Sequence, residues 1–356
     1  MNRYFQKIHT IKTSTSYQTD NKSGIIHNYF VILKYKLKSI TKNDIVMKKI
    51  DFRMFDSLLS VADYFNTLKK CKQALIEARW GDDIVCPYCG KHHCKMSKTG
   101  RFHCTACNHN FSSTVGTIFE NTKISLRQWF LAMYLISSHK KGVSSHQLSR
   151  DIKVTQKTAW YMLQKIRSLY AQSDEEALSG TVECDEMYLG GAEKNKHECK
   201  KTEGTQGRST KTKKPIFGMI QRKGNVVAMT VKDTKADTLM PIIKQFVADN
   251  TVVYTDELSS YSRLSKENFS HGVVHHNDNE FVVGDVFTNT IEGFWSHFKK
   301  MIFGIYHSVS KKHLQKYIDE EVFRWNTRKM SESYRFNDMF EKAISLCRYD
   351  DIKNVA

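Results

Sequence analysis

Three acidic residues that lie far apart in the chain, Asp185, Asp256 and Glu292, are the side chains best suited to chemistry. Carboxylates brought close together repel one another, so a cation is needed to keep them all ionised. Two Mg²⁺ or Mn²⁺ ions set about 4 Å apart can activate a water or a hydroxyl on one side of a phosphodiester and stabilise the leaving oxygen on the other. Hard oxygen ligands select these ions over zinc. The three residues therefore predict metal-dependent phosphodiester chemistry, provided that the fold brings them together.

Other charged residues nearby compete for this role or support it. Glu183 is expected on the same strand face as the first of the three acids, whereas Glu186 and Glu257 directly follow the first and the second. An isolated acid is usually solvated or paired, so we interpret these three residues as structural or supporting. Lys299 follows Glu292 by two helical turns and is expected on the same helix face, where it could bind a substrate phosphate beside the ions.

The elements that must position the three acids follow one another from residue 181 onward. Their expected order is strands at 181–189, 215–220 and 226–231, a helix at 236–249, a strand at 251–255, a short strand at 273–276 and a helix at 288–303. Asp185 lies within the first strand, Asp256 directly after the fourth, and Glu292 on the last helix. This order predicts an α/β domain with the RNase H-like fold, in which helices flank a mixed sheet.

A second metal site is predicted by two C-x-x-C pairs, Cys86 with Cys89 and Cys104 with Cys107, which are separated by 14 residues. Each pair can form a knuckle, and two knuckles can complete a closed tetrahedral Zn²⁺ site. Gly90 and Asn108 follow the knuckles, where a tight turn needs a positive φ. Cys94 and the nearby histidines could substitute, but four thiolates already fill the shell. The spacing predicts a structural zinc ribbon that serves in binding or as a scaffold.

Three helices with short connections are expected after the ribbon. Their ranges are 124–139, a short helix that begins after Ser144, and 156–170, which begins after the predicted N-cap Thr155. In the third helix Gln156, Lys157, Tyr161 and Lys165 are expected on the outward face. A helix-turn-helix places such a face in the DNA major groove. Any small helical bundle shows similar periodicity, so a purely structural bundle remains the alternative.

The composition favours a polyanionic partner. The chain has 356 residues, and its 55 Lys and Arg against 37 Asp and Glu give a formal charge of +18. Basic residues interleaved with aromatic ones suit phosphate contacts, so nucleic acid is the expected partner. Nine cysteines are too few for a disulfide scaffold and fit a reducing compartment. No stretch approaches the ~20 apolar residues of a membrane span, so we expect a cytoplasmic protein that does not bind membranes.

These patterns predict a modular chain. The expected parts are a disordered extension at 1–46, a helical segment at 47–82, the zinc ribbon at 83–120, the helix-turn-helix at 121–172, the RNase H-like domain at 178–330 with a basic insertion at 193–214, and a tail at 331–356. Clear helical periodicity starts at Phe52, which suggests Met47 as the native start. N-terminal sequencing of the native product would test that hypothesis.

The motifs together resemble one family, the bacterial insertion-sequence DDE transposases with a zinc ribbon that are related to eukaryotic Merlin elements. The resemblance covers roughly Phe52 to Arg328. Besides the cysteine pairs it rests on short motifs that start at Phe111, Gly116, Trp129, Gly142, Thr158, Val182, Tyr254 and Asn289, and on His307, His313, Leu314, Tyr317, Glu320, Arg324, Trp325 and Asn326. The 35 residues between Asp256 and Glu292 are also typical of DDE transposases and integrases. Residues 1–45 and 193–214 depart from the family pattern.

The resemblance implies that Asp185, Asp256 and Glu292 are the catalytic metal ligands, with Asn289 as a possible auxiliary ligand. It implies an enzyme that binds terminal inverted repeats, cleaves the DNA and joins the freed 3′-hydroxyl to target DNA without a covalent protein intermediate. A homo-oligomer in the synaptic complex and association with the bacterial nucleoid would follow. Two alternatives remain, a DNA-binding regulator without catalysis and an RNase H-like nuclease that acts on structured nucleic acid without needing a particular end sequence.

Overall fold

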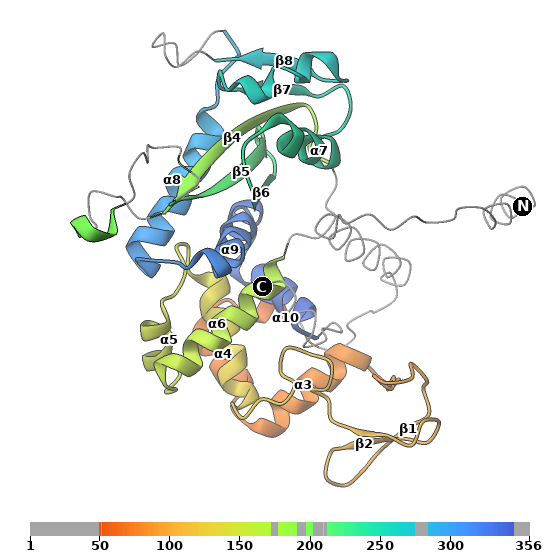
Figure 1. Cartoon of the computed structure of the whole chain (residues 1–356). Coiled ribbons are helices and arrows are strands. Elements are labelled where there is room, and N and C mark those ends of the chain that lie inside the picture. The colour runs from red at the N-terminus through yellow and green to blue at the C-terminus, as the bar shows by residue number, and fades with distance from the viewer. Residues whose placement is uncertain are drawn as a thin grey trace, which may run out of the picture. The chain divides into compact units, whose positions relative to one another are not determined.

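The computed structural model describes Ile50 and residues 52–171, 177–190, 197–201, 209, 212–274 and 284–344 (Figure 1). The chain divides into two units, Met1–Val46 and Met47–Ala356, and all described residues belong to the second. The expected disordered extension at 1–46 and most of the basic insertion at 193–214 therefore lie outside the described residues.

A five-stranded mixed sheet forms one half of the described unit. Its strands, in spatial order, are β6 (Val226–Thr230), β5 (Lys214–Gln221), β4 (Thr181–Leu189), β7 (Val252–Thr255) and β8 (Ser270–Val273). The β6–β5 and β5–β4 pairs are antiparallel, whereas the β4–β7 and β7–β8 pairs are parallel. The expected strand at 181–189 is confirmed with the same bounds. Of the strand expected at 273–276, only Val273 belongs to β8, because the register with β7 places that strand at 270–273; Val274 follows it, and positions 275–276 lie outside the described residues.

Helices cover both faces of this sheet, as expected for strands that are apolar on both sides. On one face α8 (Asn289–Met301) and α9 (Leu314–Asn326) pack on Ile216 and Ile220 of β5. On the other face α7 (Ala236–Phe246) packs on Phe217 and Met219, the alternate residues of the same strand (Figure 1). The expected helices at 236–249 and 288–303 are thus confirmed with shorter bounds.

Helix α9 also closes the open edge of the sheet at β6. The side-chain amide of Asn326 bonds both the N–H and the carbonyl of Val226, and Gln315 accepts from the N–H of Thr230 at 2.8 Å. An unpaired edge strand is a template for aggregation unless it is covered. The two amides therefore satisfy main-chain groups that a sixth strand would otherwise pair.

A helical module precedes and follows the sheet in the chain. Its helices are α2 (Leu58–Tyr64), α3 (Leu68–Trp80), α4 (Leu126–Ser138), α5 (Ser145–Asp151), α6 (Gln156–Arg167) and α10 (Glu332–Ile344). They share one hydrophobic core. The expected helix at 124–139 is confirmed as α4, which Ser125 and Gln128 cap reciprocally. Short turns complete the chain: η2 (Phe52–Met54), η3 (Ser168–Tyr170), η5 (Glu198–Lys200), η6 (Ser259–Tyr261), η7 (Leu264–Lys266), η10 (Lys311–His313) and a π-helical turn η9 (Ile302–Tyr306).

The expected tail at 331–356 is wrong for the residues that form α10. Phe336, Met339 and Phe340 recur at helical spacing and are fully buried in the core of the helical module. The ring of Phe340 packs edge-on against Phe130 of α4 with ring centroids 5.1 Å apart. The last described part of the chain therefore returns to a core that its first helices build.

Helices α5 and α6 meet at a short turn in which Lys153 has a positive φ of 52°. Ser144 and Thr155 cap the two helices as expected, and Gln156 and Lys157 are exposed. The expected outward position of Lys165 is wrong. Its side chain is buried and its Nζ donates to the carbonyl of Ile118 at 2.8 Å, because the second half of α6 is enclosed by its neighbours.

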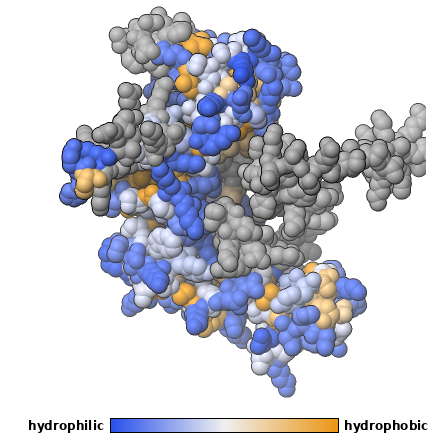
Figure 2. All heavy atoms as spheres, in the orientation of Figure 1, coloured by the Kyte–Doolittle hydropathy of each residue, from blue (hydrophilic) through white to orange (hydrophobic). Residues whose placement is uncertain are grey.

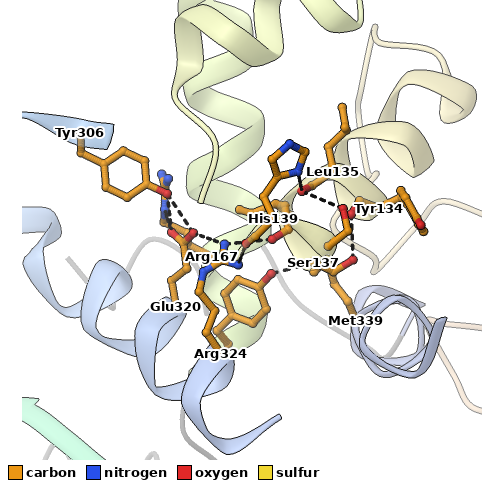
Figure 3. A network of polar contacts seen from close by, with 12 residues as sticks. Tyr134, Leu135, Ser137, His139, Arg167, Tyr306, Glu320, Arg324 and Met339 are labelled. Atoms are coloured by element: carbon orange, nitrogen blue, oxygen red, sulfur yellow. Dashed lines mark hydrogen bonds and ion pairs between the residues drawn. The ribbon is translucent and has the colours of Figure 1, made fainter. Parts of the chain in front are cut away.

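A buried ion network ties the helical module to the helices on the sheet (Figure 3). Glu320 of α9 accepts from Nε of Arg167 on α6 at 2.7 Å and from Nη2 of Arg324 at 2.5 Å. Arg324 also donates to the carbonyls of Ile136 and His139 at the end of α4, where a cation is favoured. Two cations and one carboxylate thus join α4, α6 and α9.

On the face shown in Figure 2, hydrophilic residues predominate over the described elements and hydrophobic residues lie in small separate groups. Within the described ranges, no helix combines the length and the apolar character needed to cross a membrane.

Candidate metal centres and active site

The four predicted zinc ligands meet at one point of the small sheet β1 (Cys94–Met96), β2 (Phe102–Cys104) and β3 (Asn110–Phe111). The Sγ atoms of Cys86, Cys89, Cys104 and Cys107 lie within 4.8 Å of one another. The Cys86–Cys107 and Cys89–Cys104 distances are 3.6 and 3.7 Å, against about 3.8 Å for sulfurs bound tetrahedrally at the usual Zn–S length. The donor set therefore fits Zn²⁺.

The turns and hydrogen bonds around the cysteines favour zinc binding. Gly90 and Asn108 have φ values of 72° and 57°, as the knuckles require. Although burial opposes it, the backbone N–H groups of Cys107 and Ala106 hold the pKa of Cys104 below its usual range, which favours the thiolate. Among the nearby histidines, His103 contacts Asn110. No histidine joins the cluster formed by the cysteines within the described residues.

We expect the ribbon to unfold when its metal is removed. Its core is small, since the buried cluster of the ribbon among the described residues consists of Phe102, Phe111 and two of the cysteines, and metal binding then supplies much of the folding free energy. Elemental analysis should find one zinc per chain, which Cys104→Ser should lose and Cys94→Ser should keep. The backbone amides of residues 84–111 should lose protection from hydrogen exchange in Cys104→Ser and keep it in Cys94→Ser. One zinc retained by Cys104→Ser would contradict the assignment.

The acidic centre lies where two parallel strands run side by side. Glu183 of β4 pairs with Tyr254 of β7, so Asp185, two residues further along, is next to Asp256, which directly follows β7. Carboxylate oxygens of Asp185, Glu186 and Asp256 lie within 4.8 Å of one another. The sheet register thus brings together two of the three predicted acids, which are 71 positions apart in the chain.

The electrostatics of Asp185 are compatible with a site that binds a cation. Burial and the charge of Asp256 raise the pKa of Asp185 to about 7, and Glu292 contributes in the same direction. Trp295 of α8 opposes this rise, because its Nε1 donates to Oδ2 of Asp185 at 3.0 Å. A divalent ion would neutralise the excess negative charge, and the oxygen donors fit Mg²⁺ or Mn²⁺.

The third acid that lies close to Asp185 and Asp256 is not the one expected from the sequence. Glu186 belongs to it, with its carboxylate accepting a hydrogen bond from the buried phenol of Tyr261. Glu292 does not, although it acts electrostatically on the same site from the exposed first turn of α8. Of the other candidates on this helix, Asn289 and Lys299 are both exposed. The sequence alone favours a structural or supporting role for Glu186, because an acid outside the expected triad is usually solvated or paired.

The contact between Trp295 and Asp185 depends on a glycine. Gly218 of β5 pairs with Asp185, and a Cβ at Gly218 would lie 2.6 Å from Cζ2 of Trp295. Gly218→Ala should therefore displace the indole and lower the free energy of unfolding by about 1–3 kcal/mol, as overpacking does. Thermal denaturation measures this loss. Gly293→Ala is the matched control, because its Cβ would meet nothing within 4 Å, and it should not destabilise.

Comparisons with known proteins agree with this organisation. A family model for the ISXO2-like transposase domain matches residues 177–326, the part that carries the sheet and the acids. A transposase zinc-ribbon model matches residues 67–110. A transposase-like protein of Haemophilus influenzae is 32% identical over 29% of this chain and 83% of its own length. The chain belongs to the ISXO2-like transposase family.

More distant matches extend along the chain. A protein of the transposable element ISH50 from Halobacterium salinarum is 29% identical over 73% of this transposase and 93% of its own length. A solved intasome of simian T-cell lymphotropic virus, in complex with a PP2A regulatory subunit, matches with a TM-score of 0.26 and 10% identity over 53% of this transposase and 66% of that chain. Similarity at that level carries no inference.

Two residues of this transposase centre were not singled out by sequence reasoning. Arg222 lies in the turn between β5 and β6, where a basic residue is ordinary, yet its guanidinium pairs with the buried Glu183 at 2.8 Å. Tyr261 belongs to the short turn η6, whose sequence has no sustained period. Only the tertiary structure reveals either role, because both contacts join segments far apart in the chain.

Proposed function

We propose that this transposase binds the terminal inverted repeats of its element and catalyses metal-dependent DNA cleavage and strand transfer. The observation that carries the proposal is the juxtaposition of Asp185 and Asp256 on neighbouring parallel strands, with the pKa of Asp185 raised to about 7. A protein that only bound DNA would have no need for these closely placed, mutually repelling acids.

The sheet supports the RNase H-like assignment. Its order β6-β5-β4-β7-β8 combines an antiparallel meander with two parallel additions, and helices lie on both faces. The acids occupy the centre of this arrangement, on β4 and directly after β7. A mixed sheet of this kind holds its functional groups on rigid elements, as cleavage of a phosphodiester requires.

The pair α5 and α6 supports the helix-turn-helix assignment. The exposed first half of α6 carries Gln156, Lys157, Trp160 and Tyr161. We propose that Gln156 and Lys157 contact the terminal repeat, with α6 in the major groove. Lys165 has no place in this interface because it is buried.

In the proposed mechanism Asp185, Asp256 and Glu292 hold two Mg²⁺ or Mn²⁺ ions, and Asn289 is an auxiliary ligand. Ions held there would supply the Lewis acidity that activates a water or a 3′-hydroxyl and stabilises the leaving oxygen. Trp295 orients Asp185 through its indole N–H. Lys299 binds a phosphate two turns along α8 from Glu292. No protein nucleophile is required, so no covalent protein–DNA intermediate forms.

The test uses the full chain with DNA duplexes that carry the element's own ends or scrambled ends. We expect cleavage and joining that require Mg²⁺ or Mn²⁺ and the true ends, from an oligomer that holds two ends together. End-specific binding without cleavage at any metal concentration would favour the DNA-binding regulator. Cleavage that ignores the end sequence would favour a nuclease for structured nucleic acid.

A further inference from the structure

Glu183 is the most deeply buried carboxylate near the acidic centre, and the proposed mechanism does not use it. It is fully buried on β4 and lies two residues before Asp185, on the same strand face. Its Oε2 accepts from the backbone N–H groups of Thr290 and Ile291 at 2.8 and 3.0 Å. Its Oε1 accepts from the hydroxyl of Thr290 at 2.9 Å. The carboxylate thus binds the N-terminal turn of α8.

This capping contact replaces one that the helix lacks locally. The N-cap residue Thr288 makes no side-chain capping bond to α8. The free N–H groups at a helix N-terminus favour a negative charge, and Glu183 supplies it from the sheet. The residue that follows the two capped amides is Glu292.

Arg222 completes the arrangement from the turn between β5 and β6. Its Nε donates to Oε1 of Glu183 at 2.8 Å, and its two other donor nitrogens bond the carbonyls of Asp285 and Phe287 at 2.9 Å each. The guanidinium also lies over the rings of Phe287 and Tyr254, 3.4 and 4.7 Å from their centroids. The segment that leads into α8 is therefore fixed by the same side chain that neutralises Glu183.

We propose that Glu183 and Arg222 form a positioning pair that sets the geometry of the metal-binding acids. The pair contacts each of the three elements that carry them: β4 two residues before Asp185, β7 two residues before Asp256 through Tyr254, and α8 directly before Glu292. The assignment rests on the proposed function, since it gives Glu292 a role at the ions. In this assignment Glu183 and Arg222 are neither ion ligands nor DNA contacts, and they act through the acids that they position.

A neutral glutamine at position 183 cannot accept the same hydrogen bonds or neutralise Arg222. The two oxygens of Glu183 accept four hydrogen bonds, whereas glutamine offers one oxygen and turns an NH₂ group toward donors. Glu183→Gln should therefore release the start of α8 and leave Arg222 without its counter-charge. Replacing a group that orients a metal ligand typically lowers metal affinity or activity about 10–100-fold.

The first experiment measures the cap without reference to catalysis. Amide hydrogen exchange in the full chain should show that Thr290 and Ile291 lose protection in Glu183→Gln. Mn²⁺ titration followed by electron paramagnetic resonance should show affinity reduced about 10–100-fold. The matched control is Glu320→Gln, which removes another fully buried carboxylate paired with arginine, in α9. At a temperature where both variants are folded, the control should keep wild-type Mn²⁺ affinity.

The second experiment separates positioning from simple destabilisation. Glu183→Gln should lower kcat for end cleavage and leave KM for DNA unchanged, and added Mn²⁺ should partly restore the rate. Glu183→Gln, Arg222→Gln and the double variant form a cycle in Mn²⁺ affinity, in which the double variant should lose much less than the product of the single losses.

The outcomes distinguish this inference from the proposed function. Wild-type Mn²⁺ affinity in Glu183→Gln, or multiplicative losses in the cycle, would overturn the positioning role. Weakened Mn²⁺ binding and deprotected amides in the variant, together with a wild-type protein that fails to cleave its ends, would uphold the positioning pair and reject the transposition mechanism. A wild-type protein that binds no Mn²⁺ would overturn both.

Discussion

Asp185→Asn and Asp256→Asn should each bind inverted-repeat DNA like the wild-type transposase but cleave it at least about a thousandfold more slowly. Metal ions contribute several kcal/mol of transition-state stabilisation in such reactions, and about 1.4 kcal/mol corresponds to each factor of ten in rate. Asparagine keeps the shape of the side chain while removing the charge that holds the ion. Single-turnover cleavage of a labelled end, alongside a binding titration, separates the two effects.

Asp249→Asn is the matched control for these variants. Asp249 is exposed after α7, so its substitution should leave both binding and cleavage unchanged. A cleavage rate within tenfold of wild type in Asp185→Asn would show that the acids on β4 and β7 do not carry the chemistry. Parallel loss of DNA binding would instead point to misfolding, which circular dichroism of the same samples would reveal.

The same assay decides between the two candidates for the third acid. Glu292→Gln should cleave DNA as slowly as the two aspartate variants. Glu186→Gln should retain most of the cleavage rate, because the Glu186 carboxylate accepts a hydrogen bond from Tyr261. The reverse ranking would assign the third ligand to Glu186, as the close grouping with Asp185 and Asp256 favours. The aspartate pair keeps its role in either case.

Local patterns were sufficient for much of the fold. The β-rich run that ends at a Gly-Gly pair predicted β4 to the residue, and the hairpin signal at 222–225 predicted β5 and β6 to within one residue at each end. The short β8 was misplaced because Ser270, His271 and Gly272 give no alternating pattern. That strand exists because it pairs in register with β7, which is a long-range interaction.

Long-range packing also explains the errors at individual residues. Helical spacing places Lys165 on the outer face of an isolated α6, but every residue from Met162 to Arg167 is buried in the folded protein. The helix α10 has an apolar stripe that is visible in the sequence, yet its burial depends on helices more than 200 positions earlier. Periodicity defines a face of a helix and does not reveal how many neighbours enclose it.

At the candidate site, too, local features could be predicted from the sequence and long-range contacts could not. Residue types and order were enough to single out Asp185 and Asp256, because metal-bound carboxylates must come from elements that meet at one edge. The third acid of the close group and the Glu183–Arg222 pair could not be predicted, since they depend on sheet register and on contacts between segments 39 and more positions apart. The zinc ligands were predictable because all four lie on two local turns.

The residues Tyr317, Glu320 and Arg324, which follow the acids in the family pattern, acquire a structural explanation. The guanidinium of Arg167 lies 4.1 Å from the ring centroid of Tyr317 and pairs with Glu320. Arg324 reaches the end of α4. These side chains attach α6, the candidate DNA-binding helix, to α9, which in turn packs on the sheet.

Breaking this network should destabilise the folded protein strongly. Glu320→Gln should lower the free energy of unfolding by about 3–5 kcal/mol, because it leaves two buried arginines without a counter-charge. The Tm should fall by roughly 10 °C. Glu341→Gln, at an exposed position of α10, should change stability by no more than about 0.5 kcal/mol. Urea denaturation and thermal melting measure both, and a loss below 1 kcal/mol at Glu320 would contradict the role of the network.

The pH dependence of this difference follows from the charge on Glu320. Burial alone would raise its pKa, but the charges of Arg167 and Arg324 outweigh burial and hold the pKa of Glu320 below its ordinary value. A lowered pKa in the folded state stabilises the protein above the unfolded value of about 4.3, and this contribution is lost as the pH falls through the folded value. The stability gap between wild type and Glu320→Gln should therefore be full at pH 7 and shrink below pH 4 in urea titrations. A gap that widened on acidification would mean that the folded protein raises the pKa of Glu320 above its unfolded value, which would contradict its pairing with the two arginines.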